Sequence, residues 1–162
     1  METSPHPAID VALGAVSGRD RAARLVAAVE RGDTVAVLVD TPDARAIVFI
    51  ERDGTGQWVA PSLIGESPCR HTTRAATTRR GYPLNAKQTK RVGTTTSDTG
   101  WFGLTGYAAA DAVAVTVASS LDTHRVDVAD DGLVLAAVRA RLDEDPVVVI
   151  HLASGENIID PR

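Results

Sequence analysis

The chain has 162 residues, of which 44% are hydrophobic and 4% aromatic, and its formal net charge at pH 7 is −4. This length is enough to bury a substantial core, and we expect one compact domain overall. A single cysteine, Cys69, excludes an intrachain disulfide and a cysteine-based zinc cluster. No apolar run approaches the roughly 18 residues of a membrane span, and the acidic, proline-bearing start is unlike a signal peptide. We therefore expect a cytoplasmic protein that makes no membrane contact; the alternative is a secreted protein whose leader has been removed.

The first 66 residues predict a tail followed by a helix. Residues 1–16 are interpreted as an N-terminal tail, in which residues 9–16 fit either a strand or a loose helix. The run 17–20 resembles a capping box, and the apolar residues after it recur at helical spacing, namely Ala22, Leu25, Val26 and Val29. Gly32 is a natural stop signal, because helices commonly end at a left-handed glycine. The pattern predicts a helix over residues 18–31.

Three strands are expected after that helix. Residues 34–39 carry valines at alternate positions, residues 44–52 are rich in β-branched side chains, and residues 57–60 follow the glycine-rich turn 53–56. A helix followed by a three-stranded meander buries its apolar stripe against the sheet. Residues 17–66 are thus interpreted as a helix plus a β-meander.

The composition changes over residues 67–99, which we interpret as a basic insert rich in threonine and arginine. Within 67–97 there are seven arginines and lysines, eight threonines and no acidic residue, so the rest of the chain carries −11. No hydrophobic period runs through this segment, which favours a long loop with at most short strands. Charge is therefore segregated between an acidic body and a cationic insert.

Residues 100–162 predict the strands of an antiparallel β-sandwich. Val113, Val115 and Val117 alternate with small residues, residues 124–128 alternate likewise, and 147–152 is a continuous apolar run. Asp131-Gly132 is a hairpin signal, because this pair tolerates a positive φ. Residues 133–142 fit both a strand and a helix; the preceding turn favours the strand, and a helix there would shift the class towards α+β. The predicted fold is mainly β: an N-terminal helix packed on a meander, then sandwich-like strands.

The order of features after Gly100 also resembles the β-sandwich segments of uncharacterised actinobacterial proteins. The matching features are Gly103-Leu104-Thr105-Gly106, the valine-rich strand at 113–115, Asp131-Gly132 with the apolar residues after it, and the run 147–152 with its glycine turn. The resemblance implies an immunoglobulin-like sandwich. It implies no functional residue.

Anion binding is the sharpest chemistry that the sequence suggests. Guanidinium groups donate paired hydrogen bonds to phosphate and stay charged, so a basic loop suits nucleic acid or another polyanion. The candidate anion-binding residues are Arg74, Arg79, Arg80, Lys87, Lys90 and Arg91. The alternative is a solvated loop, or one docked on the acidic face of the same chain.

Other candidate groups have ordinary structural explanations. Cys69 and His71 lie two residues apart, but no orienting group accompanies them. His124 and His151 fall on predicted strands, where histidines are more often structural than ligands. The acidic pairs at 130–131 and 143–145 bracket turns. We find no catalytic signature and expect no metal site and no cofactor.

The sequence therefore predicts a non-catalytic binding or protein-interaction module. Its expected partner is another protein or a second copy of the chain, docked on exposed strand edges or on the insert. Nucleic-acid or polyanion binding through residues 67–97 is the first alternative. An enzyme with a site assembled from distant loops is the second.

Overall fold

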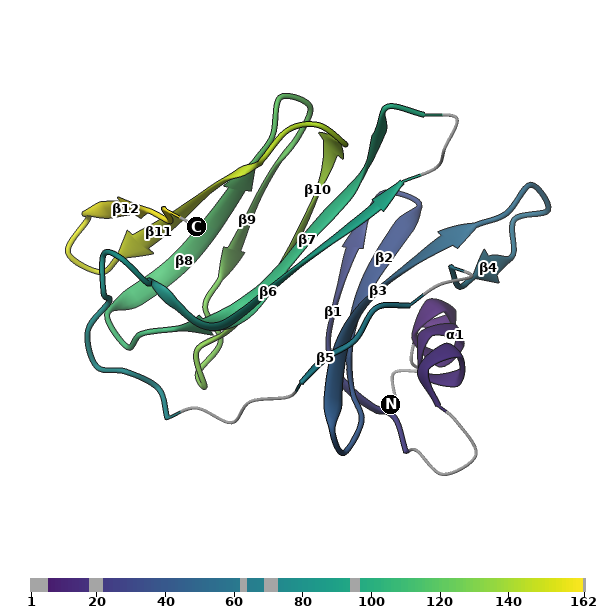
Figure 1. Cartoon of the computed structure of the whole chain (residues 1–162), viewed down its shortest axis with the longest axis horizontal. Coiled ribbons are helices and arrows are strands. Elements are labelled where there is room, and N and C mark those ends of the chain that lie inside the picture. Colours follow the sequence, from purple (N-terminus) through teal and green to yellow (C-terminus); the bar gives the residue numbers. More distant parts are fainter. Residues whose placement is uncertain (1–5, 18–21, 62–63, 69–72, 94–96, 162) are drawn as a thin grey trace. The chain divides into compact units, whose positions relative to one another are not determined.

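The computed structural model describes residues 6–17, 22–61, 64–68, 73–93 and 97–161. The chain divides into two compact units, residues 1–69 and 70–162, where the sequence predicted one domain with an insert. The predicted class is confirmed: the fold is mainly β, with one short helix and antiparallel sheets (Figure 1). Within the described ranges, no helix is long and apolar enough to cross a membrane.

The first unit is one helix on one antiparallel sheet. Its sheet has the order β1-β2-β3-β4, and β5 pairs with the other end of β3. The elements are α1 (Pro7–Val16), β1 (Arg24–Arg31), β2 (Thr34–Asp40), β3 (Ala44–Arg52), β4 (Trp58–Val59) and β5 (Ser67–Pro68). The strands predicted at 34–39, 44–52 and 57–60 thus correspond to β2, β3 and β4.

Helix α1 begins where local chemistry allows it. Pro7 occupies the first turn, where its missing N–H is not needed, and Nδ1 of His6 accepts a hydrogen bond from the N–H of Ala8 at 3.1 Å. Ala8, Ala12 and Val16 form a buried stripe with a spacing of four residues. Helix α1 lies beside the sheet (Figure 1), and its stripe packs against valines of β2 and apolar residues of β3. A helix on the meander is therefore present, but it lies within the predicted tail.

The prediction of a helix over residues 18–31 is wrong. Residues 24–31 form strand β1, which pairs antiparallel with β2 through a tight turn at Gly32-Asp33; residues 18–21 lie outside the described residues. Gly32 has φ +62°. A positive φ is required both by a helix C-cap and by a two-residue hairpin, so this glycine fits either structure. The long-range pairing with β2 decides between them.

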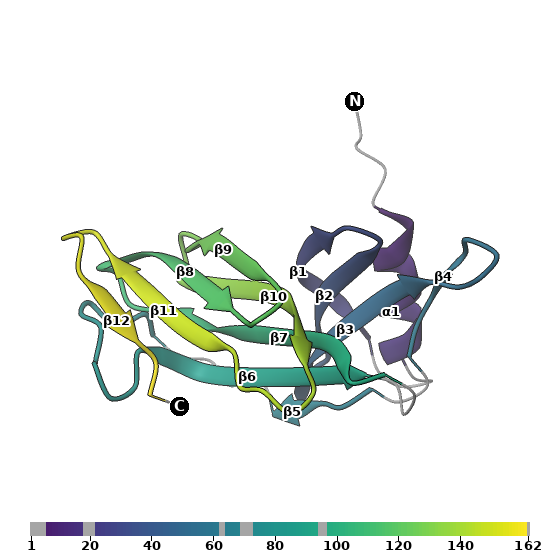
Figure 2. The same ribbon diagram turned by 90° about the horizontal axis from the view of Figure 1, so that it is seen from above.

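The second unit is a β-sandwich of two antiparallel sheets, which form separate layers in Figure 2. The three-stranded sheet has the order β10-β7-β6, and the four-stranded sheet has the order β12-β11-β8-β9. The strands are β6 (Leu84–Gly93), β7 (Thr99–Ala108), β8 (Ala112–Ala118), β9 (Thr123–Asp127), β10 (Leu133–Arg141), β11 (Val147–Leu152) and β12 (Asn157–Ile159). Fully buried side chains from both sheets, such as Leu104, Val115, Val134 and Ile150, fill the space between them.

The ambiguous segment 133–142 is a strand, as the turn signal favoured. The turn itself has a different role from the hairpin that was predicted. Gly132 has φ +92°, but β9 and β10 belong to different sheets, so the turn carries the chain across the sandwich. The core requires this crossing, because Val126 of β9 and Val134 of β10 face it from opposite layers.

The prediction that residues 67–99 form a long loop is also wrong. Residues 84–93 are the ten-residue strand β6, paired with β7 over nearly its whole length, and Leu84 is part of the core. Residues 73–83 form irregular structure with one bridge between Arg79 and Tyr82. β6 is an edge strand without apolar alternation, and Thr89 and Arg91 on it are exposed.

Candidate functional site

Arg74, the first of the predicted anion-binding residues, is bound to backbone carbonyls. Its guanidinium donates to the carbonyl oxygens of Ala108 at 3.2 Å, Ala109 at 3.1 Å and Asp130 at 2.9 Å. Ala108 and Ala109 lie where β7 leads into β8, and Asp130 lies in the connection from β9 to β10. Arg74 therefore fastens the segment after residue 73 to the second unit.

Three more of the six cations form ion pairs within the second unit. Arg80 pairs with Glu156, and Nζ of Lys87 lies 2.9 Å from Oδ2 of Asp160. Arg91 lies 2.5 Å from Oδ1 of Asp145, donates to the carbonyl oxygen of Glu144, and has its guanidinium carbon 5.3 Å from the centre of the Phe102 ring. The acidic partners all come from the region around β11 and β12.

Arg79 and Lys90 are the remaining two candidates. Among the described residues, neither has a carboxylate partner within 4 Å; Arg79 is exposed and Lys90 is half-buried on the opposite face of β6 from Lys87 and Arg91. The structure thus does not gather the six cations into one surface. Anion binding by the whole set stays a prediction.

One side of the sandwich is closed by side chains that bind the edge of β10. Nδ1 of His124 accepts from the N–H of Ala137 at 3.1 Å, and the carboxylate of Asp122 accepts from the N–H of Arg139 at 3.0 Å. Ser119 donates its hydroxyl to the carbonyl oxygen of Arg139. Backbone groups along that edge are satisfied by the neighbouring layer. His124 is therefore a structural residue.

The opposite side of the sandwich holds a cavity of about 370 Å³ between β6 and the pair β11–β12. Its apolar lining comes from both sheets: Phe102, Leu104, Pro146, Val147, Val148 and Ile159. Two of these side chains are largely exposed, Val147 at 47% and Ile159 at 65%. The Lys87–Asp160 and Arg91–Asp145 pairs lie on its lining, so the four charges there sum to zero. We call this region the open-side cavity.

His151 makes a polar ladder on the four-stranded sheet. Its Nε2 lies 2.7 Å from Oγ1 of Thr116, and its Nδ1 lies 2.8 Å from Oδ1 of Asn157. Because an amide oxygen only accepts, Nδ1 donates to Asn157, and in the neutral ring Nε2 then accepts from the threonine hydroxyl. The order hydroxyl, imidazole, amide is that of a nucleophile, a base and an orienting group. These side chains line neither the open-side cavity nor the second cavity described below.

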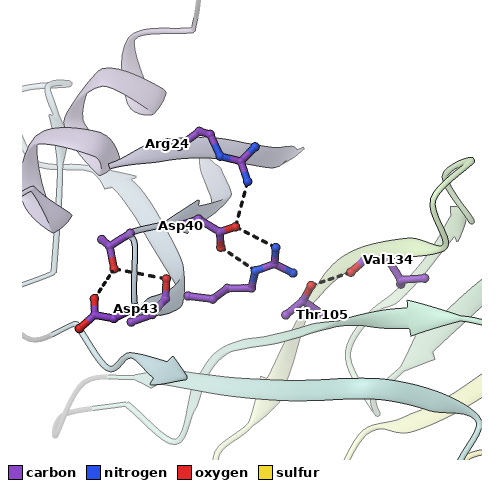
Figure 3. A network of polar contacts seen from close by, with 8 residues as sticks. Arg24, Asp40, Asp43, Thr105 and Val134 are labelled. Carbon is purple, nitrogen blue, oxygen red and sulfur yellow. Dashed lines mark hydrogen bonds and ion pairs between the residues drawn. The ribbon is translucent and has the colours of Figure 1, made fainter. Parts of the chain in front are cut away.

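The first unit holds a buried ion pair. Arg45 donates to both carboxylate oxygens of Asp40, at 2.7 and 2.9 Å, and Arg24 donates to the same carboxylate at 3.1 Å (Figure 3). This charge is compensated within the sheet itself. Figure 3 also shows Thr105 of the second unit donating to the carbonyl oxygen of Val134 at 2.9 Å. Both contacts satisfy buried polar groups rather than expose reactive ones.

The remaining candidates are the Cys69 and His71 pair and the acidic residues at 143–145. Cys69 and His71 lie outside the described residues. In the ranges that the structure does describe, no three His, Cys, Asp or Glu side chains come together to hold a metal ion. The acidic residues at 143–145 are partly used in binding: Asp145 pairs with Arg91, and Glu144 binds the backbone N–H groups of Ser120 and Arg141.

Comparisons with protein-family models, with curated proteins and with solved structures find no match for this chain. The candidate site therefore depends on geometry alone. Sequence reasoning missed the open-side cavity because its lining comes from four strands far apart in the chain. Val147 is within a predicted strand, but its exposure and that of Ile159 depend on which sheet edge they occupy.

Proposed function

We propose that the chain is a non-catalytic protein-interaction module that associates with a second copy of itself through the open-side cavity. The observation that carries the proposal is the contrast between the two sides of the sandwich. At β10, side chains of the other layer cap the strand edge. At β6, two ion pairs border an apolar cavity with Val147 and Ile159 exposed beside it.

The chemistry of the cavity favours an apolar side chain as its occupant. The floor is aromatic and aliphatic, and burying such a surface is the main source of association free energy at the centre of an interface. The cations on the lining are already paired with Asp145 and Asp160, so no net charge attracts an anion. A protein surface that carries an exposed aliphatic group fits this lining.

A second copy supplies such a surface. In a two-fold interface the same patch lies on both partners, so the patch must contain both a projection and a recess. Ile159 is 65% exposed and lies on the lining of the cavity, so the projecting side chain and the recess belong to the same patch. The balanced charges on the lining are also self-complementary, because each copy presents two cations and two anions.

Contact through side chains is favoured over addition of a strand to β6. This strand is an edge, but a bulge between Asn85 and Gln88 interrupts its register, and Ala86 has φ +50°. Bulges and lysines on an edge strand oppose pairing with another strand.

We also propose that the protein is located in the cytoplasm. Cell fractionation tests this location.

Sedimentation analysis over a range of concentrations tests this proposal with a matched pair of variants. Val147→Asp places a charge on the cavity lining. Val113→Asp changes a valine of nearly the same exposure, 46% against 47%, on the same sheet but outside that lining. We expect a dimer that Val147→Asp weakens by at least about tenfold and that Val113→Asp leaves unchanged. A monomer at concentrations up to about 1 mM, or equal effects of the two variants, would overturn the proposal.

A further inference from the structure

Residues 73–83 form a pre-organised wall at one end of the second unit. Arg74 binds three carbonyl oxygens, and the N–H of Ala110 donates to the carbonyl oxygen of Ala75 at 2.8 Å. Asp111 accepts from both the N–H and the hydroxyl of Thr78, at 2.9 and 2.6 Å. Arg80 pairs with Glu156. Fixed in this way, the segment loses little conformational freedom when a ligand binds.

This wall borders a second cavity of about 220 Å³, which shares no lining residue with the open-side cavity. The polar residues on its lining include Thr73, Thr77, Asn85 and Arg79. The two tyrosines of the chain, Tyr82 and Tyr107, also line it. No acidic side chain is among the described residues of this lining, so its net charge is +1.

We propose that this cavity binds a sugar phosphate of monosaccharide size. Arg79 supplies the group that recognises phosphate, because its guanidinium donates two parallel hydrogen bonds and has no carboxylate partner among the described residues. The side chain of Tyr82 is 53% exposed, which leaves apolar ring surface for the C–H face of a sugar.

The hydroxyls and the amide decide between a sugar and a flat apolar ring. Thr73, Thr77 and Asn85 offer donors and acceptors that match the several hydroxyls of a sugar. An apolar ring in the same place would cover these groups without giving them partners, which costs free energy for each one. The proposal is independent of self-association, because it uses other residues on another part of the unit.

Titration of the full chain with glucose 6-phosphate, followed by amide NMR, tests the proposal. We expect saturable shifts for the amides of Thr77, Arg79 and Tyr82, and an affinity at least about tenfold higher than for glucose or for inorganic phosphate. Arg79→Gln is expected to lower the affinity at least about tenfold. Lys90→Gln removes the same charge away from the cavity and is expected to change nothing.

Three results would overturn the proposal. One is the absence of shifts at these amides with glucose 6-phosphate. Another is equal affinity for inorganic phosphate, which would mean that the cavity recognises the anion alone. The last is equal binding by Arg79→Gln and the unaltered chain. Because Arg79 is exposed, the variant is expected to fold, and its amide spectrum away from the cavity checks this.

Discussion

Nζ of Lys87 lies 2.9 Å from Oδ2 of Asp160, and this ion pair joins β6, the edge strand of one sheet, to the residue that directly follows β12, the edge strand of the other. The side chain of Asp160 is only 5% exposed. Its backbone N–H also donates to the carbonyl oxygen of Val148. The cationic segment thus contributes to the sandwich itself, since part of its charge compensates acidic groups of the same unit.

The two lysines of the chain provide a test of that role. Lys87→Met removes the ammonium partner of a nearly buried carboxylate and is expected to lower the free energy of unfolding by about 1–3 kcal/mol. Lys90→Met, on the same strand, breaks no ion pair among the described residues and is expected to change it by less than about 0.5 kcal/mol. Urea unfolding of both variants measures the difference; equal losses would contradict the assignment.

The two arginines on Asp40 are expected to differ in their effect on stability. Arg45 is 8% exposed and Arg24 is 71% exposed, although both donate to this carboxylate. Arg45→Met removes the buried guanidinium that binds both oxygens of a buried carboxylate and is expected to cost about 3–5 kcal/mol. Arg24→Met is expected to cost less than about 1 kcal/mol. Hydrogen exchange of the β2 amides reports on this unit alone, and similar exchange in both variants would refute the prediction.

Gly100 is expected to tolerate no side chain. A Cβ at this position would lie 2.0 Å from the carbonyl oxygen of Val92, where β6 and β7 pair closely. Gly100→Ala must therefore separate these strands, at an expected cost of about 3 kcal/mol or more. Gly54→Ala is the control, because its added Cβ meets nothing within 4 Å. Thermal unfolding compares the two, and a stable Gly100→Ala protein would show that the strands are spaced differently.

Glu144 is expected to give the second unit a pH-dependent contribution to stability. The backbone N–H of Arg141 lowers the pKa of Glu144 below its ordinary value of 4.5, and hydrogen bonds from Ser120 add to this effect. A lowered folded-state pKa means that the contribution is present above pH 4.5 and is lost as the pH falls through the folded pKa. Glu144→Gln should therefore be destabilising at neutral pH and nearly neutral at low pH. A difference in stability between Glu144→Gln and the unaltered chain that stays constant from neutral to low pH would contradict this cause.

Binding to nucleic acid, the alternative use of the cations, is expected to be weak. Of the six candidate cations, only Arg79 and Lys90 have neither a carboxylate nor a carbonyl partner for their side chains among the described residues. The plot of log affinity against log salt for single-stranded DNA should therefore have a slope of about −1.4. Six available cations would give about −4. Fluorescence anisotropy at several salt concentrations measures this slope. A steep slope that disappears when Arg79, Arg80, Lys90 and Arg91 are neutralised would favour the alternative.

Local patterns in the sequence determined most of the strands. Alternating valines at 113–117 and the apolar run 147–152 correspond to β8 and β11, and 34–39 and 44–52 correspond to β2 and β3. Successive side chains of a strand point to opposite faces, which is a local property of the backbone. A strand buried on one face therefore shows alternating apolar residues, and one buried on both faces shows a continuous apolar run. The mainly β class follows from the same traces.

Only the tertiary structure decided the rest. Residues 24–31 have helical spacing but pair with β2, and the polar residues 84–93 become an edge strand because β7 offers them a partner. Lys87 and Arg91 are paired because β11, β12 and their turns bring Asp145 and Asp160 to the same side of the sandwich. Such partners lie 54 and 73 residues away along the chain. Long-range pairing leaves no local period, and for that reason both cavities were invisible in the sequence.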